Sequence, residues 1–301
     1  MSWKEAINQF KAYLMYERGL SEHSVMAYVR DIEKLAQFVE MELTGKSPFL
    51  IEASDLRQML IWMGEVGLEK TSRARILSGI RAFYKYLLIE NLVNDNPASL
   101  LEMPKSSRHI PDVLRYDEIQ EMLDAIDLST NHGTRNRAML ETLYACGLRV
   151  TELVTLQLSN FFPEIDLVKV VGKNNKERLI PIGEDAVKHI QLYIEGVRRK
   201  QMNIDPKHED YLFLNRRGKK LTRVYVFLLI KELATAVGIK KKVSPHTFRH
   251  SFATHLIEGG ANLKAVQDML GHESITTTEI YTHLDTAYLR DTILRFHPLN
   301  R

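Results

Sequence analysis

The sequence predicts a mainly α-helical protein that has two domains and one small antiparallel β-sheet. Apolar residues recur at spacings of three and four through most of the 301 residues, as they do on the buried faces of helices. Only two neighbouring stretches, 167–171 and 178–182, alternate like the strands of a hairpin. The length exceeds that of a typical single domain, and a stretch containing proline and serine at 104–111 divides the chain.

The first domain, residues 1–103, reads as four helices. Ser2 and Glu5 form a capping-box pattern before an apolar stripe. The four helices are expected to begin near Ser2, Ser21, Ser54, and Thr71 or Ser72. Asn94 to Pro97 ends the fourth helix, because proline cannot continue it.

The second domain, residues 112–301, follows an extended linker at 104–111. Its strands are expected at 167–171, 178–182 and 211–214. Its helices are expected at 116–126, at 134–144, in a short segment from Arg149, and at 183–199, 222–237, 245–258, 262–269, 274–281 and 285–295.

The composition is that of an ordinary globular protein, with 45% apolar and 26% charged residues. The single cysteine, Cys146, cannot form a disulfide within the chain. The N-terminus lacks the pattern of a signal peptide, and no apolar run approaches the roughly 20 residues of a membrane helix. A cytoplasmic location without membrane contact is therefore expected.

Positive charge is concentrated in the second domain. Residues 169–249 hold 19 Lys and Arg against 8 Asp and Glu, whereas residues 1–105 hold 13 against 14. Such a stretch is either a solvated basic surface or a surface for double-stranded DNA, whose phosphates attract lysine and arginine. We favour DNA, and the individual candidates for contacts are Arg73, Arg75, Arg81 and Lys176.

One set of residues suits attack on a phosphodiester. It consists of two arginines, two histidines and a tyrosine: Arg149, His246, Arg249, His272 and Tyr281. Arginine meets two phosphate oxygens at once and stays protonated. A phenol, with a reference pKa of about 10, needs a neighbour to accept its proton, and histidine titrates in a suitable range. Tyrosine would then form a covalent phosphoryl intermediate.

In this order the residues resemble the signature of the tyrosine recombinases, the phage-integrase-like family, and are most similar to its Xer type. The match consists of Arg149, the H-x-x-R pair His246 and Arg249, the tripeptide ending at His272, and Tyr281 nine residues later. The resemblance extends over nearly the whole chain. The segment 168–181 is similar to the family's lysine-bearing hairpin, which implies a catalytic lysine at Lys173. Asn174 and Glu279 depart from residues that are common in Xer proteins at these places.

The resemblance implies an N-terminal core-binding domain, a C-terminal catalytic domain, and a site-specific recombinase that resolves chromosome dimers. Tyr281 would form a 3′-phosphotyrosyl bond, with His246 as its base and Lys173 as the acid toward the 5′-hydroxyl. The reaction would pass through a Holliday junction without cofactor or metal. Four protomers would assemble on DNA, as identical copies or with a sister recombinase, and a DNA translocase could activate them. The apolar segment 285–301 would dock on a neighbouring subunit.

Other functions fit some of the same residues. An integrase or transposase of a mobile element, or a type IB topoisomerase, would use similar chemistry, and a DNA-binding protein without catalysis would have lost part of the set. His246, His250 and His255 lack the H-E-x-x-H pattern of a zinc site, and we interpret His250 and His255 as packing residues. The sequence Gly45–Ser47 resembles the end of a phosphate-binding loop, but Glu40 stands where that loop needs glycine.

Overall fold

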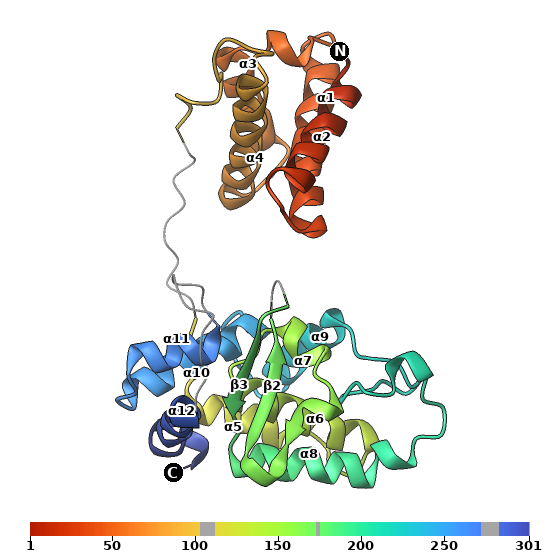
Figure 1. The fold of residues 1–301 in the computed structure, drawn as a ribbon, viewed down its shortest axis with the longest axis vertical. Coiled ribbons are helices and arrows are strands. Elements are labelled where there is room, and N and C mark those ends of the chain that lie inside the picture. Colours follow the sequence, from red (N-terminus) through yellow and green to blue (C-terminus); the bar gives the residue numbers. More distant parts are fainter. Residues whose placement is uncertain (103–111, 173–174, 272–282, 301) are drawn as a thin grey trace. The chain divides into compact units, whose positions relative to one another are not determined.

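The computed structural model describes residues 1–102, 112–172, 175–271 and 283–300, and no side chains at 283–288 or 300. The chain forms two compact units, Met1–His109 and Ile110–Arg301, which are shown in Figure 1. The expected linker, 104–111, lies outside the described residues. No helix in the described part of the chain is long and apolar enough to cross a bilayer.

The first unit is helical, as predicted. Its helices are α1 (Trp3–Tyr16), α2 (Glu22–Glu42), α3 (Ala53–Glu65) and α4 (Lys70–Ile89). Their apolar stripes meet in one core, whose largest buried side chains include Phe10, Phe38, Phe83 and Tyr84. Ser2 and Ser21 cap α1 and α2 as expected, each accepting a bond from a backbone N–H of the first turn.

Two helices of this unit begin slightly earlier than predicted. Helix α3 begins at Ala53 because Glu52, not Ser54, is the cap residue, and the carboxylate of Asp55 accepts the N–H of Glu52 at 2.9 Å. Helix α4 begins at Lys70, after Glu69, rather than at Thr71 or Ser72. At the start of α3, the carboxylate of Asp55 therefore satisfies a free N–H group, and no side-chain bond from Glu69 caps α4.

The second unit surrounds a small sheet with helices. These are α5 (Tyr116–Asp124), α6 (Asn131–Ala145), α7 (Val150–Val154), α8 (Glu184–Gly196), α9 (Arg223–Ala236), α10 (Pro245–Glu258), α11 (Leu263–Leu270) and α12 (His283–Phe296). Helix α6 begins three residues before the predicted 134, because Thr130 caps it through the N–H of Gly133 at 2.9 Å. Helix α8 ends at Gly196, and a 3-10 turn at Arg198–Lys200 replaces its predicted last residues. The helix predicted at 274–281 lies outside the described residues.

The sheet consists of β1 (Phe161–Phe162), β2 (Leu167–Val171) and β3 (Glu177–Pro181), antiparallel in that order. Val168 pairs with Ile180, so the predicted hairpin is confirmed with β3 shifted by one residue. The strand predicted at 211–214 is wrong. That segment forms only isolated bridges, one at each end, and Leu212, Phe213 and Leu214 are all buried. Because three consecutive side chains are buried, the segment fills the core on both of its sides. A short apolar run has the same sequence pattern in such a segment and in a buried strand, so the sequence does not distinguish them.

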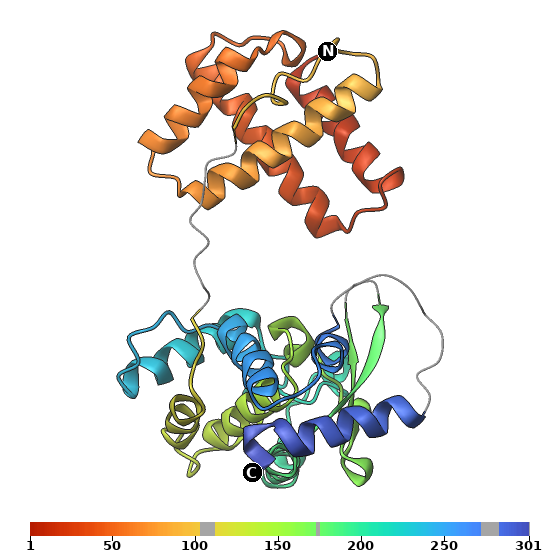
Figure 2. The same cartoon turned by 90° about the vertical axis from the view of Figure 1, so that its left-hand side faces the viewer.

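Helix α12 packs on its own unit. Leu289 and Ile293 are 4% and 2% exposed and belong to the core of the second unit, and Phe296 packs against it. Figure 2 shows this helix, in dark blue, lying across the unit. The single chain therefore covers Leu289 and Ile293, whereas Leu294 is 47% exposed, and docking of the segment 285–301 on a neighbouring subunit stays a prediction.

Candidate active site

Arg149 stands at the start of α7, directly after a turn made by Gly147. Its backbone N–H donates to Oε2 of Glu152 at 2.8 Å, and its Nη1 donates to Oε1 of the same carboxylate at 2.9 Å. Glu152 is therefore the anion that pairs with Arg149. The side chain of Arg149 is 36% exposed, so the guanidinium is anchored on one side and faces solvent on the other.

Arg249 approaches the same place from α10. It is buried, and it donates from Nη1 to the carbonyl oxygen of Gly147 at 2.7 Å and from Nη2 to that of Leu270 at 2.5 Å. Burial, followed by the nearby charges of Arg149 and Arg178, lowers the pKa of Arg249 to about 10. The guanidinium therefore remains protonated at neutral pH, and the structure brings the two predicted arginines together.

Glu152 is the anion between these cations. Burial alone would raise the pKa of its carboxyl, but hydrogen bonds and charge from Arg178 and Arg149 outweigh burial and hold that pKa below its usual range. Oε2 of Glu152 also lies 3.9 Å from Nη1 of Arg249. Within the described residues, three guanidiniums thus surround one carboxylate, which leaves local positive charge for an anionic substrate.

Arg178 is the residue of this cluster that the sequence analysis missed. It was treated only as the first residue of a strand. In the structure it pairs across the sheet with buried Val170 and is itself 7% exposed. An arginine on the buried face of a predicted strand was the available signal, since a charged residue seldom occupies such a position without partners.

His246 lies in the first turn of α10, three residues before Arg249, which places both on one side of the helix. Its side chain is exposed, so its imidazole is available to an incoming molecule. The other predicted catalytic residues, Lys173, His272 and Tyr281, lie outside the described residues. Their described neighbours are Gly172, which follows β2 and precedes Lys173, and Gly271, the C-cap of α11, which directly precedes His272.

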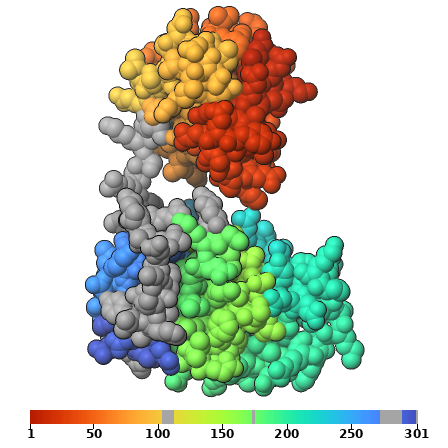
Figure 3. Space-filling view, viewed as in Figure 1, coloured from red at the N-terminus to blue at the C-terminus, as the bar shows by residue number. Residues whose placement is uncertain are grey.

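These elements meet at one place on the second unit. Figure 3 shows the surface of β2 and β3, in green, and part of the surface of α10 and α11, in blue, on one face of the second unit. Arg149 and Arg249 come from α7 and α10, and both bind carbonyls at the end of α11. The arrangement can hold an anion between cations that are fixed in advance, which is how charge developing on a phosphoryl group is stabilised.

Two of the three candidate DNA contacts in the first unit, Arg75 and Arg81, have polar partners within the protein. Arg75 forms an ion pair with buried Asp31, with Nη2 to Oδ1 at 2.6 Å. Arg81 donates to the carbonyl oxygens of Ala98 and Leu101. Arg73 lies against Gly64. Lys176, the fourth candidate, is exposed in the hairpin turn. Contact of these residues with DNA stays a prediction.

His255 of α10 has a structural partner in the second unit. Nδ1 of His255 lies 2.7 Å from the hydroxyl of Tyr144, which confirms its predicted packing role. No group of three or more His, Cys, Asp or Glu side chains suited to a metal ion occurs among the described residues.

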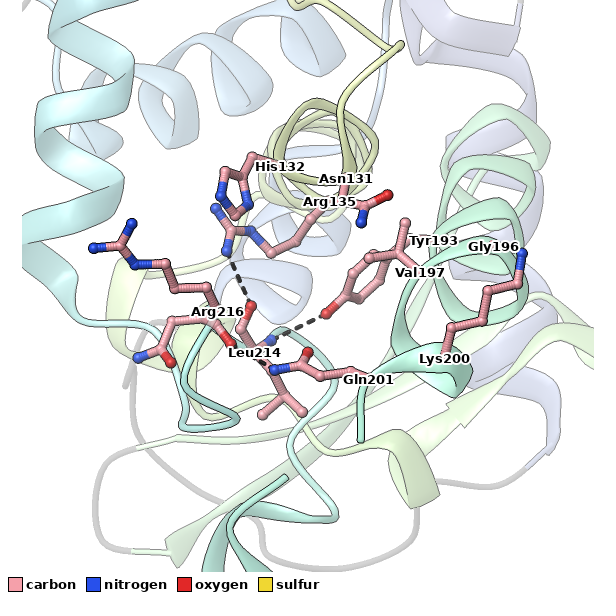
Figure 4. Close-up of a pocket in the computed structure, with 11 residues that line it drawn as sticks. Asn131, His132, Arg135, Tyr193, Gly196, Val197, Lys200, Gln201, Leu214 and Arg216 are labelled. Carbon is pink, nitrogen blue, oxygen red and sulfur yellow. Dashed lines mark hydrogen bonds between the residues drawn. The ribbon is translucent and has the colours of Figure 1, made fainter. Parts of the chain in front are cut away.

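A separate pocket of about 360 Å³ lies between the start of α6 and the segment after α8 (Figure 4). Arg135 forms part of its wall, but its guanidinium donates to the carbonyl oxygen of Leu214 at 3.0 Å and to Asn136 and Tyr225. None of the three predicted catalytic residues that the structure describes, Arg149, His246 and Arg249, lines this pocket. We therefore assign the chemistry to the arginine cluster and not to the pocket.

Comparison with known proteins identifies relatives along the whole chain. Residues 112–287 match the phage integrase family, and residues 7–91 match the N-terminal SAM-like domain of phage integrases. The tyrosine recombinase XerD of Listeria innocua is 38% identical over 295 residues, covering 98% of this chain and 99% of the relative. XerD of Chlorobaculum tepidum is 40% identical over 301 residues, with coverage of 98% and 97%.

A solved structure of the XerH site-specific recombinase, bound to a palindromic difH substrate in a post-cleavage complex, shares the fold. The TM-score is 0.71 at 22% identity, covering 96% of this chain and 84% of that one.

Proposed function

This chain belongs to the phage integrase family of tyrosine recombinases, and we propose that its catalytic residues are Arg149, Lys173, His246, Arg249, His272 and Tyr281. It is a site-specific recombinase, an enzyme that exchanges DNA strands. The observation that supports this assignment of residues best is the convergence of Arg149 and Arg249 on one carboxylate and on one turn, directly before His272.

In the proposed reaction, the phenolic oxygen of Tyr281 attacks the scissile phosphorus while the bond to the 5′-oxygen breaks. His246 accepts the phenolic proton, and Lys173 donates a proton to the leaving 5′-oxygen. Arg149 and Arg249, with His272, bind the non-bridging oxygens on which negative charge grows. The product is a 3′-phosphotyrosyl bond and a free 5′-hydroxyl. A 5′-hydroxyl from the partner duplex then attacks that bond and releases Tyr281, so the phosphoester is conserved and no energy source is needed.

We propose that four protomers act on two DNA sites through a Holliday junction, either as identical copies or together with a sister recombinase. A DNA translocase is a further proposed partner. The first unit would serve as the core-binding domain, with Arg73, Arg75 and Arg81 toward DNA and Lys176 from the second unit. Full-length similarity to XerD proteins favours resolution of chromosome dimers in the cytoplasm over integration of a mobile element.

Denaturing electrophoresis after incubation with a nicked suicide substrate tests the proposal. Such a substrate releases a short fragment after cleavage, so the covalent adduct accumulates. The wild type should form an adduct on a site from the chromosomal termination region, and Tyr281→Phe should form none. Tyr16→Phe is a matched control, because Tyr16 is 82% exposed in the other unit. An adduct that persists in Tyr281→Phe would assign the nucleophile to another residue.

A further inference from the structure

The end of helix α11 is held by three arginines from three different elements. Nε of Arg178 donates to the carbonyl oxygen of Met269 at 2.9 Å, Nη2 of Arg249 to that of Leu270 at 2.5 Å, and Nη2 of Arg149 to that of Gly271 at 3.2 Å. The last carbonyls of a helix lack partners within the helix and carry partial negative charge. Three consecutive carbonyls are therefore each satisfied by a different cation.

The two outer members of this set differ in exposure. Arg178 has a side chain that is 7% exposed, whereas that of Arg149 is 36% exposed. Arg178 binds both oxygens of Glu152, with Nη1 to Oε1 and Nη2 to Oε2 at 2.9 Å each. A fork of this kind satisfies a carboxylate in a fixed plane. The buried Arg178 therefore neutralises Glu152, and the exposed side of Arg149 stays available to another anion.

Arg178 also packs directly under Gly271. A Cβ atom placed on Gly271 would lie 3.2 Å from Nη1 and 3.3 Å from Cζ of Arg178, and Gly271 has a positive φ of 61°. Glycine is favoured in that conformation, and here it also lets the guanidinium approach the backbone. A side chain at position 271 would therefore press against the guanidinium of Arg178.

We propose that Arg178 is a positioning residue for strand exchange, which fixes Glu152 against the end of α11 and so orients Arg149 toward the scissile phosphate. The proposal rests on the function proposed above and extends it to a buried residue. Without Arg178, the buried carboxylate of Glu152 would draw in Arg149 to replace the lost partner, because a buried charge without a partner is costly. Arg149 would then be withdrawn from the substrate.

Arg178→Lys tests this, because lysine keeps the charge but lacks the planar fork and the Nε donor. The matched control is Arg198→Lys: Arg198 is equally buried in the same unit and donates to the carbonyl oxygens of Tyr211 and Leu212, away from the cluster. Both variants should lose similar thermal stability. Only Arg178→Lys should slow single-turnover cleavage, by roughly 10- to 100-fold, while the Kd for DNA stays within about threefold of the wild type.

Modified substrates separate positioning from a merely structural role. A methylphosphonate at the scissile position removes one negative charge, so the loss in Arg178→Lys should shrink. A 5′-bridging phosphorothiolate provides a leaving group that needs no proton, so it should not restore the rate. Restoration would mean that Arg178 acts through the hairpin of Lys173, and it would overturn the proposal.

A double-variant comparison keeps the test decisive if Arg178→Lys folds poorly. On a Glu152→Gln background the carboxylate is gone, and adding Arg178→Lys should change the cleavage rate by less than about threefold. Additive losses would contradict action through Glu152. If the wild type forms an adduct and Arg178→Lys cleaves at the same rate, this proposal alone is overturned. If the wild type forms no adduct, the proposed function is overturned as well.

Discussion

Nη1 of Arg249 donates to the carbonyl oxygen of Gly147 at 2.7 Å, across 102 positions of the chain. This bond ties α10 to the turn that introduces Arg149, two residues after Gly147. The two arginines of the proposed site are therefore coupled through the backbone of one glycine.

Gly147→Ala should destabilise the second unit. Gly147 has a φ of 56°, and an added Cβ would lie 2.3 Å from Cδ1 of Phe252. Left-handed backbone and overlap with a buried ring together should cost about 2 kcal/mol or more in the free energy of unfolding, measured by urea denaturation. Gly196→Ala is the control, since nothing lies within 4 Å of its added Cβ. Equal stability of the two variants would contradict this account.

Arg249→Lys should abolish most of the cleavage activity. Lysine cannot donate to the carbonyls of Gly147 and Leu270 and to a phosphate together, so the cleavage rate should fall by about 100- to 1,000-fold. DNA binding in a gel shift should change little. Arg295→Lys, on the exposed side of α12, should cleave like the wild type. A cleavage rate of Arg249→Lys within about threefold of the wild type would show that Arg249 is not a catalytic residue.

Acid should weaken the packing of helix α12. His297, just beyond this helix, is buried beside Tyr144 and Phe252, and burial lowers its pKa to about 3. Its Nδ1 accepts the N–H of Leu299, and its Nε2 is buried without a hydrogen-bond partner. Between pH 6.5 and 3, the unfolded histidine binds a proton that the folded one does not. The free energy of unfolding should therefore decrease as the pH is lowered, by at most about 1.4 kcal/mol per pH unit.

His297→Phe should flatten that dependence, because phenylalanine does not titrate. The measurement is the free energy of unfolding between pH 7.5 and pH 5 for both proteins. His23→Phe serves as the control, since His23 is exposed in the first unit. A slope that is the same in wild type and His297→Phe would assign the acid sensitivity to other groups.

Arg75→Gln should destabilise the first unit. Burial raises the pKa of Asp31, and the hydrogen bond and charge of Arg75 offset part of that rise. Removing Arg75 leaves a buried carboxylate without its cation, at a cost of about 1–2 kcal/mol after allowance for the half-exposed arginine. Lys85→Gln, on the exposed side of α4, should leave the thermal midpoint unchanged. The double variant with Asp31→Asn should recover part of the loss, and an unimproved midpoint would count against the pairing.

Most helices were predictable because their signals are local. The capping serines at positions 2 and 21 and the spacing of His246 and Arg249 are read within a few residues, and the structure forms α1, α2 and α10 accordingly. The hairpin was predictable for the same reason, since alternation and its turn are adjacent in the chain.

The missed features depend on distant segments. Arg178 is important only because α7 and the end of α11 are brought to its strand, 26 and 91 residues away. The sequence does not show which apolar residues of α12 the same chain covers, and only the packing shows that Leu289 and Ile293 are among them. Residues 211–214 form an apolar run because most of them fill the core, and no local pattern distinguishes such a run from a buried strand.

The three arginines at the end of α11 make this helix intolerant of changes in length. Each residue turns an α-helix by about 100°, so inserting or deleting one residue before Met269 would rotate all three bound carbonyls away from their donors at once. Substitutions on the outer surface of α11 could accumulate freely, while its number of residues could not change. Variation among proteins with this arrangement should therefore appear as exchanged side chains in this helix, and gaps should fall before it begins.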